Sequence, residues 1–138
     1  MIAEFGLHVS NEAFLSEFLY WPRQTYPGTQ ALLTDLSRQY TLASLSTISE
    51  MHWNRISTEM DLVAYFGSNF PSFQTGYVKP DREAYLHALN TLDCKPEKVL
   101  FMDDNRANVE TARSLGMAAF TVDGLTGVED ILKRKSVY

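Results

Sequence analysis

The chain has 138 residues, of which 45% are hydrophobic and 21% charged, with a net charge of −5 and a pI of about 5.1. These values suit a single domain with a hydrophobic core, and they argue against nucleic-acid binding, which usually needs a basic face. No apolar run approaches the roughly 18 to 20 residues of a membrane span, and the N-terminus lacks the pattern of a secretory signal. The single cysteine, Cys94, excludes an intrachain disulfide, so we expect a reducing, cytoplasmic location.

The first half of the chain is predicted to hold three helices and one strand. The first helix lies near residues 10–19 and ends at Trp21-Pro22. Four of its residues form one apolar face: Phe14, Leu15, Phe18 and Leu19. The turn at Pro27-Gly28 opens a second helix, whose leucines face inward. A strand is then expected at 41–48 and a third helix at 50–63.

The second half is predicted to alternate in the same way. The expected elements are, in order, a short strand at 65–66, a loop at 67–76, a helix from Pro80, a strand at 98–102, a helix at 105–115, a strand at 117–122 and a short helix at 128–135. Such alternation is typical of an α/β fold, with an open parallel sheet and helices on both faces. Ligands of these sheets bind beyond the carboxyl ends of the strands.

Three of these strand ends and loops carry polar residues that suit a phosphoryl group. Ser46 and Thr47 follow the run TLASL, Lys79 lies in the loop GYVKPD, and Asp103 and Asp104 follow the apolar run KVLFM. Two adjacent carboxylates need a cation beside them, and Mg²⁺ favours one or two carboxylates with waters and a phosphate. A lysine and a hydroxyl can bind the same phosphate. Together these residues predict a phosphoryl-binding pocket.

Each of these residues also has a plain structural explanation when taken alone. A serine at a strand end is most often a turn residue, and a lysine in a loop is most often solvated. Asp103 and Asp104 precede a predicted helix, where carboxylates commonly cap the N-terminus. The order and spacing of the whole set, and no single member, favour the functional interpretation.

The set resembles the haloacid dehalogenase-like (HAD) hydrolase superfamily, in the branch with a helical cap. Ser46 resembles its second motif, Lys79 in GYVKPD its third, and LFMDDNRANVETARSLGM its fourth. The resemblance covers about residues 26–124. It implies a Rossmann-like core over residues 26–138, and it implies that residues 1–25 are the remnant of the helical cap.

The resemblance also implies a role for each candidate residue. Lys79 and Asp103 would be catalytic, and Ser46, Thr47 and Lys79 would bind the substrate phosphate. Asp104 would be a ligand of a Mg²⁺ cofactor, with Asp103 supporting the metal shell or pairing with Lys79. The substrate would be a small phosphorylated molecule, hydrolysed through an aspartyl intermediate. Dehalogenating members take a halogenated substrate and need no metal.

One motif of the family is absent from these 138 residues. The nucleophile belongs to a D-x-D motif on the first strand, and the chain contains no D-x-D. In the family that strand lies between the strands ending at Ser46 and Asp103. We therefore expect a sheet lacking its first strand, with a gap that the flanking strands close, that another chain fills, or that marks a fragment. An open position of this kind invites self-association.

Three functions follow from these observations. The first is a HAD hydrolase, a phosphatase that is inactive as this chain alone because the nucleophile is missing. The second is a non-catalytic relative that keeps the pocket and acts by binding. The third, a regulatory receiver-type domain, is disfavoured because its acidic pair would lie early in the chain, whereas Asp103 and Asp104 lie late.

Overall fold

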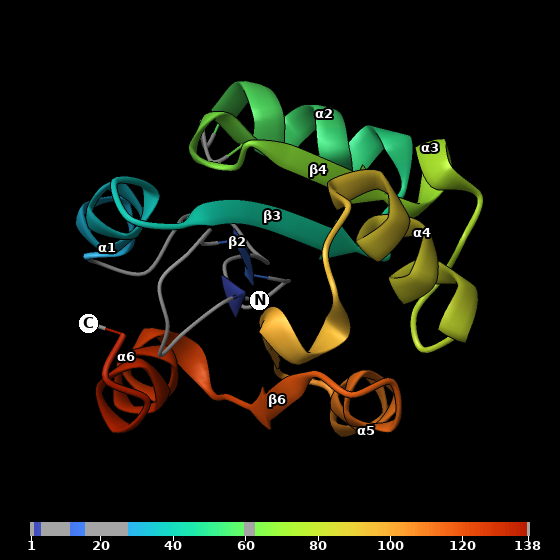
Figure 1. Cartoon of the computed structure of the whole chain (residues 1–138). Helices are drawn as coiled ribbons and strands as arrows, with labels where there is room; N and C mark the ends of the chain where they lie inside the picture. The colour runs from blue at the N-terminus through green and yellow to red at the C-terminus, as the bar shows by residue number, and fades with distance from the viewer. Residues whose placement is uncertain (1, 4–11, 16–27, 60–62, 138) are drawn as a thin grey trace.

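The computed structural model describes residues 2–3, 12–15, 28–59 and 63–137 (Figure 1). The strands are β1 (Ile2–Ala3), β2 (Glu12–Leu15), β3 (Thr41–Ser46), β4 (Ser68–Pro71), β5 (Val99–Asp103) and β6 (Ala118–Thr121). The α-helices are α1 (Thr29–Ser37), α2 (Glu50–Glu59), α3 (Ser72–Thr75), α4 (Arg82–Leu92), α5 (Arg106–Ser114) and α6 (Gly124–Arg134). Two short 3-10 helices, η1 (Val63–Tyr65) and η2 (Pro96–Lys98), complete the described elements. None of these helices is long and apolar enough to cross a membrane.

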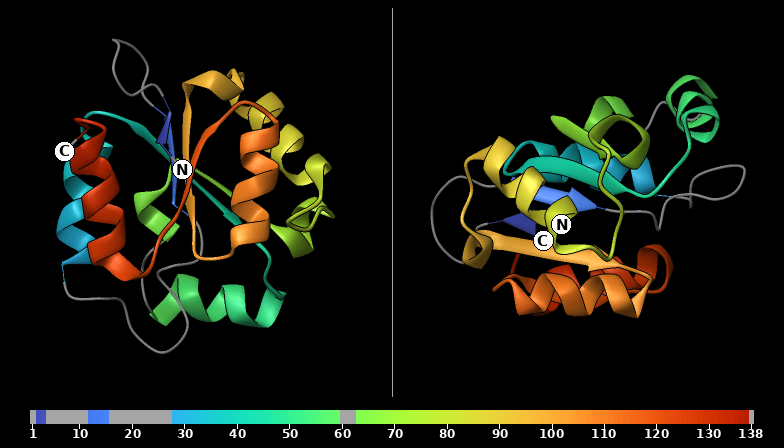
Figure 2. Two further views of the ribbon diagram at one scale, coloured as in Figure 1. Left: turned by 90° about the horizontal axis from the view of Figure 1, so that it is seen from below. Right: turned by 90° about the vertical axis from the view of Figure 1, so that its right-hand side faces the viewer.

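The strands form one sheet in the order β4-β3-β2-β1-β5-β6, and β2 also pairs with β5. Every pairing is parallel except those of β1, which is antiparallel to β2 and β5. Helices cover both faces, α1 and α6 on one and α4 and α5 on the other (Figure 2). This confirms the predicted α/β fold with a parallel sheet.

The core is split into two layers by the central strand β5, all of which is buried. Because side chains alternate along a strand, Leu100 and Met102 pack with α1 and α6, while Val99 and Phe101 pack with α4 and α5. Asp103 is the last residue of this strand and is completely buried. The Asp103 carboxylate is therefore held at the carboxyl edge of the sheet, between the two apolar layers, and it is not exposed to water.

The expected gap in the sheet is filled by β2, which corrects two predictions. Phe14 pairs with Ala43 of β3 on one side and with Phe101 of β5 on the other. Residues 12–15 are therefore a strand of the core, and the helix predicted near 10–19 is wrong there. A short apolar run fits a strand or a helix equally well, and the unpaired backbone groups of β3 and β5 favour the strand.

The same finding bears on residues 1–25 and on self-association. Most of the segment assigned to a cap remnant, residues 1, 4–11 and 16–25, lies outside the described residues. Its described parts, β1 and β2, belong to the core sheet. Since β2 occupies the position between β3 and β5, the expectation that another chain fills it loses its structural basis.

A further correction concerns the region after the third predicted helix. No strand forms at 65–66, because Tyr65 ends η1 and Phe66 follows it, and the segment 67–76 predicted as a loop contains β4 and α3. Ser44 of β3 donates a hydrogen bond to Asn69 of β4, with 2.7 Å between the oxygens. This contact helps to stabilise β4, a polar edge strand whose sequence lacks the alternation of apolar residues that predicts a strand.

Helix α5 starts at a side-chain cap, which gives a modest and specific stability prediction. The Oδ1 atom of Asn105 accepts a hydrogen bond from the backbone N–H of Ala107, at 2.9 Å. Replacing Asn105 with alanine should lower the free energy of unfolding by about 1 kcal/mol, because one N–H at the helix start loses its partner. Urea unfolding measures the change. Asn90→Ala, at an exposed position near the end of α4, is the control and should be nearly neutral; equal losses would contradict the cap.

Candidate active site at the carboxyl edge of the sheet

The structure brings Lys79 and Asp103 into direct contact, although 24 residues separate them. The Lys79 Nζ and Asp103 Oδ2 atoms are 2.7 Å apart, and the two side chains are 1% and 0% exposed. Lys79 lies in the loop between α3 and α4, and Asp103 ends β5. The ion pair thus joins this loop to the central strand where a parallel sheet binds its ligands.

Two further donors hold the Asp103 carboxylate. The backbone N–H of Asn105 donates to Oδ1 at 2.9 Å, and the Asn108 side-chain amide donates to Oδ2 at 3.1 Å. Burial alone would raise the pKa of Asp103, but the charge and hydrogen bond of Lys79, with the Asn105 amide, hold it below its usual value. Asp103 is therefore charged at neutral pH despite its burial.

Asp104, the next residue, has the opposite electrostatic environment. It is exposed overall, yet partial burial of its carboxyl group, a hydrogen bond with Asp103 and the negative charge of Asp103 raise its pKa. The charged form of Asp104 would therefore be stabilised by a cation. Among the described residues no group of three or more His, Cys, Asp or Glu side chains gathers, so a cation here would rely on few protein ligands.

Ser46 and Thr47 lie at the end of β3, as predicted. Thr47 Oγ1 accepts a hydrogen bond from the backbone N–H of Lys79 at 3.1 Å, so this hydroxyl contacts the lysine loop directly. Ser46 is half-buried and pairs with Pro71 of β4. The hydroxyl groups after β3 and the loop that carries Lys79 are thus held at the same edge of the sheet.

Asn108 and Tyr85 also belong to the site, although neither was among the residues predicted for it. Asn108 lies five residues after Asp103, so the first turn of α5 returns its amide to the carboxylate. The Tyr85 hydroxyl donates to the backbone carbonyl of Asn108 at 2.8 Å. Burial, and then the charge of Asp103, raise the pKa of Tyr85, which keeps it a neutral donor. Both residues support Asp103 from the α4–α5 face.

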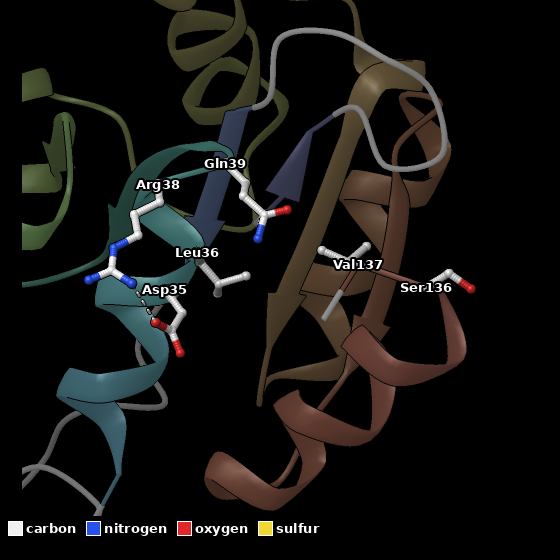
Figure 3. Close-up of a pocket in the computed structure, with 6 residues that line it drawn as sticks. All are labelled: Asp35, Leu36, Arg38, Gln39, Ser136 and Val137. Atoms are coloured by element: carbon white, nitrogen blue, oxygen red, sulfur yellow. Dashed lines mark hydrogen bonds and ion pairs between the residues drawn. The ribbon is translucent and has the colours of Figure 1, made fainter.

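A shallow cavity of about 370 Å³ lies at the opposite edge of the sheet (Figure 3). It opens between the C-terminal ends of α1 and α6, where an ion pair joins Arg38 to Asp35 at 3.4 Å. Both of these side chains are at least half exposed. Because it lies at the amino-terminal edge of the parallel strands, this cavity is separate from Lys79 and Asp103.

The fold and the site define an α/β protein with a buried lysine–aspartate pair at the carboxyl edge of a parallel sheet. The sequence profile of the haloacid dehalogenase-like hydrolases matches residues 2–116. The chain belongs to this family, as its motifs indicated.

Named relatives agree with this assignment. The chain is 31% identical over 114 residues to flavin mononucleotide hydrolase 1 of Arabidopsis thaliana, covering 83% of this chain and 44% of that protein. It is 30% identical over 112 residues to the phosphorylated carbohydrates phosphatase of Thermotoga maritima, covering 80% and 50%. The chain thus spans half or less of the length of these relatives.

A solved structure shows the same fold. The HAD family enzyme bt-2542 of Bacteroides thetaiotaomicron, in complex with magnesium and inorganic phosphate, aligns with a TM-score of 0.71 and 21% identity. The alignment covers 75% of this chain and 56% of that one.

Proposed function

We propose that this chain forms the phosphoryl-binding part of a Mg²⁺-dependent phosphatase that acts on a small phosphorylated molecule. The observation that carries the proposal is the buried contact of 2.7 Å between Lys79 and Asp103, with Asp104 beside it. It fixes a positive charge, and next to it a carboxylate suited to a cation, at the edge where ligands of parallel sheets bind.

Each candidate residue has a task in this proposal. The Lys79 ammonium provides positive charge for the phosphoryl oxygens, and Asp103 with Asn108 fixes its position. The Ser46 hydroxyl donates to a phosphate oxygen. Thr47 holds the Lys79 backbone through its accepting Oγ1 atom and adds a second hydroxyl at the same edge. These groups bind and orient the phosphoryl group.

The donor set fits Mg²⁺ with Asp104 as its main protein ligand. Both Asp103 oxygens accept hydrogen bonds from the protein. Burial of the Asp104 carboxyl group, its hydrogen bond with Asp103 and the negative charge of Asp103 raise the pKa of Asp104, so a cation beside it would stabilise its charged form. Asp103 would then support the metal shell from the side of Lys79. Mg²⁺ commonly keeps several waters and takes one or two carboxylates. When bound, it supplies Lewis-acid stabilisation of phosphoryl charge.

A phosphorylated substrate is favoured over a halogenated one by the named relatives. One is a flavin mononucleotide hydrolase and another acts on phosphorylated carbohydrates. The acidic residue Asp104 also favours a metal-dependent reaction, since dehalogenating members of the family need no metal.

A second function, binding without catalysis, is favoured by one sequence observation. The 138 residues contain no D-x-D, so the carboxylate expected to attack phosphorus is missing from this chain. We therefore expect the isolated chain to bind phosphate without turning over phosphate monoesters.

The test measures binding and turnover separately on the purified chain. Inorganic phosphate is titrated calorimetrically with Mg²⁺ and with EDTA, and p-nitrophenyl phosphate and 2-chloropropionate serve as substrates. We expect that phosphate binds only with Mg²⁺ and that its affinity falls about tenfold in Asp104→Asn. We expect no turnover of either substrate. Asp130→Asn, at an exposed position of α6, is the matched control and should bind like the original chain.

Three other outcomes would each contradict a specific part of this proposal. A folded chain that binds no phosphate contradicts the proposed site. Turnover of the phosphate ester that Asp104→Asn abolishes would contradict the inactivity, and it would show that another carboxylate acts as the nucleophile. Turnover of 2-chloropropionate without metal would instead assign the chain to the dehalogenating members.

A further inference from the structure

Ser72 lies outside the contacts of the candidate site, yet its hydroxyl holds the end of the strand that carries part of that site. It is the first residue of α3, directly after β4. The backbone N–H of Ile48 donates to Ser72 Oγ at 2.9 Å, and the Ser72 hydroxyl donates to the Ile48 carbonyl at 3.1 Å. One side chain thus satisfies both backbone groups of a residue 24 positions away.

The position of this contact explains why a hydroxyl is needed. Ser46 pairs with Pro71 in the parallel ladder of β3 and β4. Proline has no N–H, so it cannot donate to the ladder at the point where β3 approaches its polar end. A serine hydroxyl combines one donor with two acceptor sites, and it can replace the next backbone pair. Ser72 therefore extends the pairing beyond Pro71, to Ile48.

From Ile48 a series of contacts leads to the ion pair. Thr47 precedes Ile48, and its Oγ1 atom accepts a hydrogen bond from the backbone N–H of Lys79 at 3.1 Å. Lys79 in turn contacts Asp103 at 2.7 Å. The edge strand β4 is thus linked through the end of β3 and the lysine loop to the central strand β5.

We propose that Ser72 is a positioning residue for the phosphoryl-binding site. It fixes residues 46–48 so that the Ser46 hydroxyl and the Thr47 contact with Lys79 keep their places. Ser72 itself does not touch the phosphate. This inference rests on the proposed function, because the ligand it serves is the phosphoryl group.

The experiment combines affinity for inorganic phosphate with local hydrogen exchange. We expect Ser72→Ala to weaken phosphate binding in Mg²⁺ by about three- to tenfold, the equilibrium equivalent of one lost hydrogen bond. The backbone amides of Ile48 and Lys79 should exchange faster, while the amide of Val109 in α5 keeps its rate as an internal reference. Ser72→Thr keeps a hydroxyl and should restore both quantities.

A matched control and a second variant keep the test decisive. Ser114→Ala removes an exposed hydroxyl of α5 that donates to the Thr111 carbonyl at 2.7 Å, and it should change neither affinity nor exchange. If Ser72→Ala is too unstable to purify, Ser72→Cys, with its weak donor and acceptor, is measured with the same expectation.

Failure of this inference is distinguishable from failure of the proposed function. If the original chain binds no phosphate, the proposed function fails, and the exchange of the Lys79 amide still decides whether Ser72 positions the loop. If Ser72→Ala binds phosphate as tightly as the original chain, or leaves the Lys79 amide unchanged, Ser72 is a local structural residue and the proposal is overturned.

Discussion

Replacing Lys79 with methionine is expected to lower the free energy of unfolding by about 3–5 kcal/mol. The substitution removes the ammonium that lies 2.7 Å from Asp103, and it leaves a carboxylate that is 0% exposed. A buried charge without its partner is costly because it has lost its hydration without compensation. Equilibrium urea unfolding at neutral pH in EDTA, followed by circular dichroism, measures the loss.

Two further variants separate the ion pair from the loss of a lysine in general. Lys133→Met, at an exposed position of α6, should change stability by less than about 0.5 kcal/mol. The double variant Lys79→Met with Asp103→Asn removes both charges, keeps a carbonyl acceptor for the Asn105 N–H and should recover part of the loss. A Lys79→Met chain within about 1 kcal/mol of the original would mean that water or another cation compensates Asp103, and it would contradict the buried pair.

The loss of stability in Lys79→Met should also depend on pH, in a direction that the pKa of Asp103 determines. In the original chain the pKa of Asp103 is lowered, so its contribution to stability is present above the unfolded pKa of about 3.9 and is lost as the pH falls through the folded value. Without Lys79, burial dominates and raises this pKa, which makes protonation stabilising. The stability difference between the two chains should therefore shrink between neutral pH and about pH 4. A difference that grows on acidification would contradict this sign.

Sequence reasoning succeeded where local pattern and tertiary structure agree. Residues 99–102 of the predicted strand at 98–102 lie in the fully buried β5, and the turn from Pro80 to Asp81 precedes α4 as expected. The pairing of Lys79 with Asp103 was one of the two roles that the family resemblance implied for Asp103, and the structure shows this contact. In each case a short segment carried its own signal.

Prediction failed where a neighbouring strand decides the structure. The run at 12–15 has no alternation of its own, and its strand state depends on pairing with β3 and β5. The polar strand β4 contains a proline and is held at the edge by contacts from β3, including that from Ser44 to Asn69. The role of Ser72 depends on two segments meeting 24 residues apart, which no local pattern reports.

The placement of β2 in the middle of the sheet leads to the second large effect. Replacing Phe14 with proline should lower the free energy of unfolding by about 2–4 kcal/mol beyond the effect of Phe14→Ala. Phe14 has β3 on one side and β5 on the other, so its N–H faces a neighbouring strand whichever way it points. Proline removes that donor and leaves a carbonyl of the neighbour unpaired.

Comparison with alanine isolates the backbone, because both substitutions remove the aromatic ring and only proline removes the N–H. Urea unfolding of the two variants gives the difference, and hydrogen exchange of the Ala13 amide in the original chain gives an independent measure. If proline and alanine destabilise equally, and the Ala13 amide exchanges freely, then residues 12–15 do not occupy the position between β3 and β5. A central gap would then return to the sheet, and another chain or segment would have to supply the strand beside Asp103.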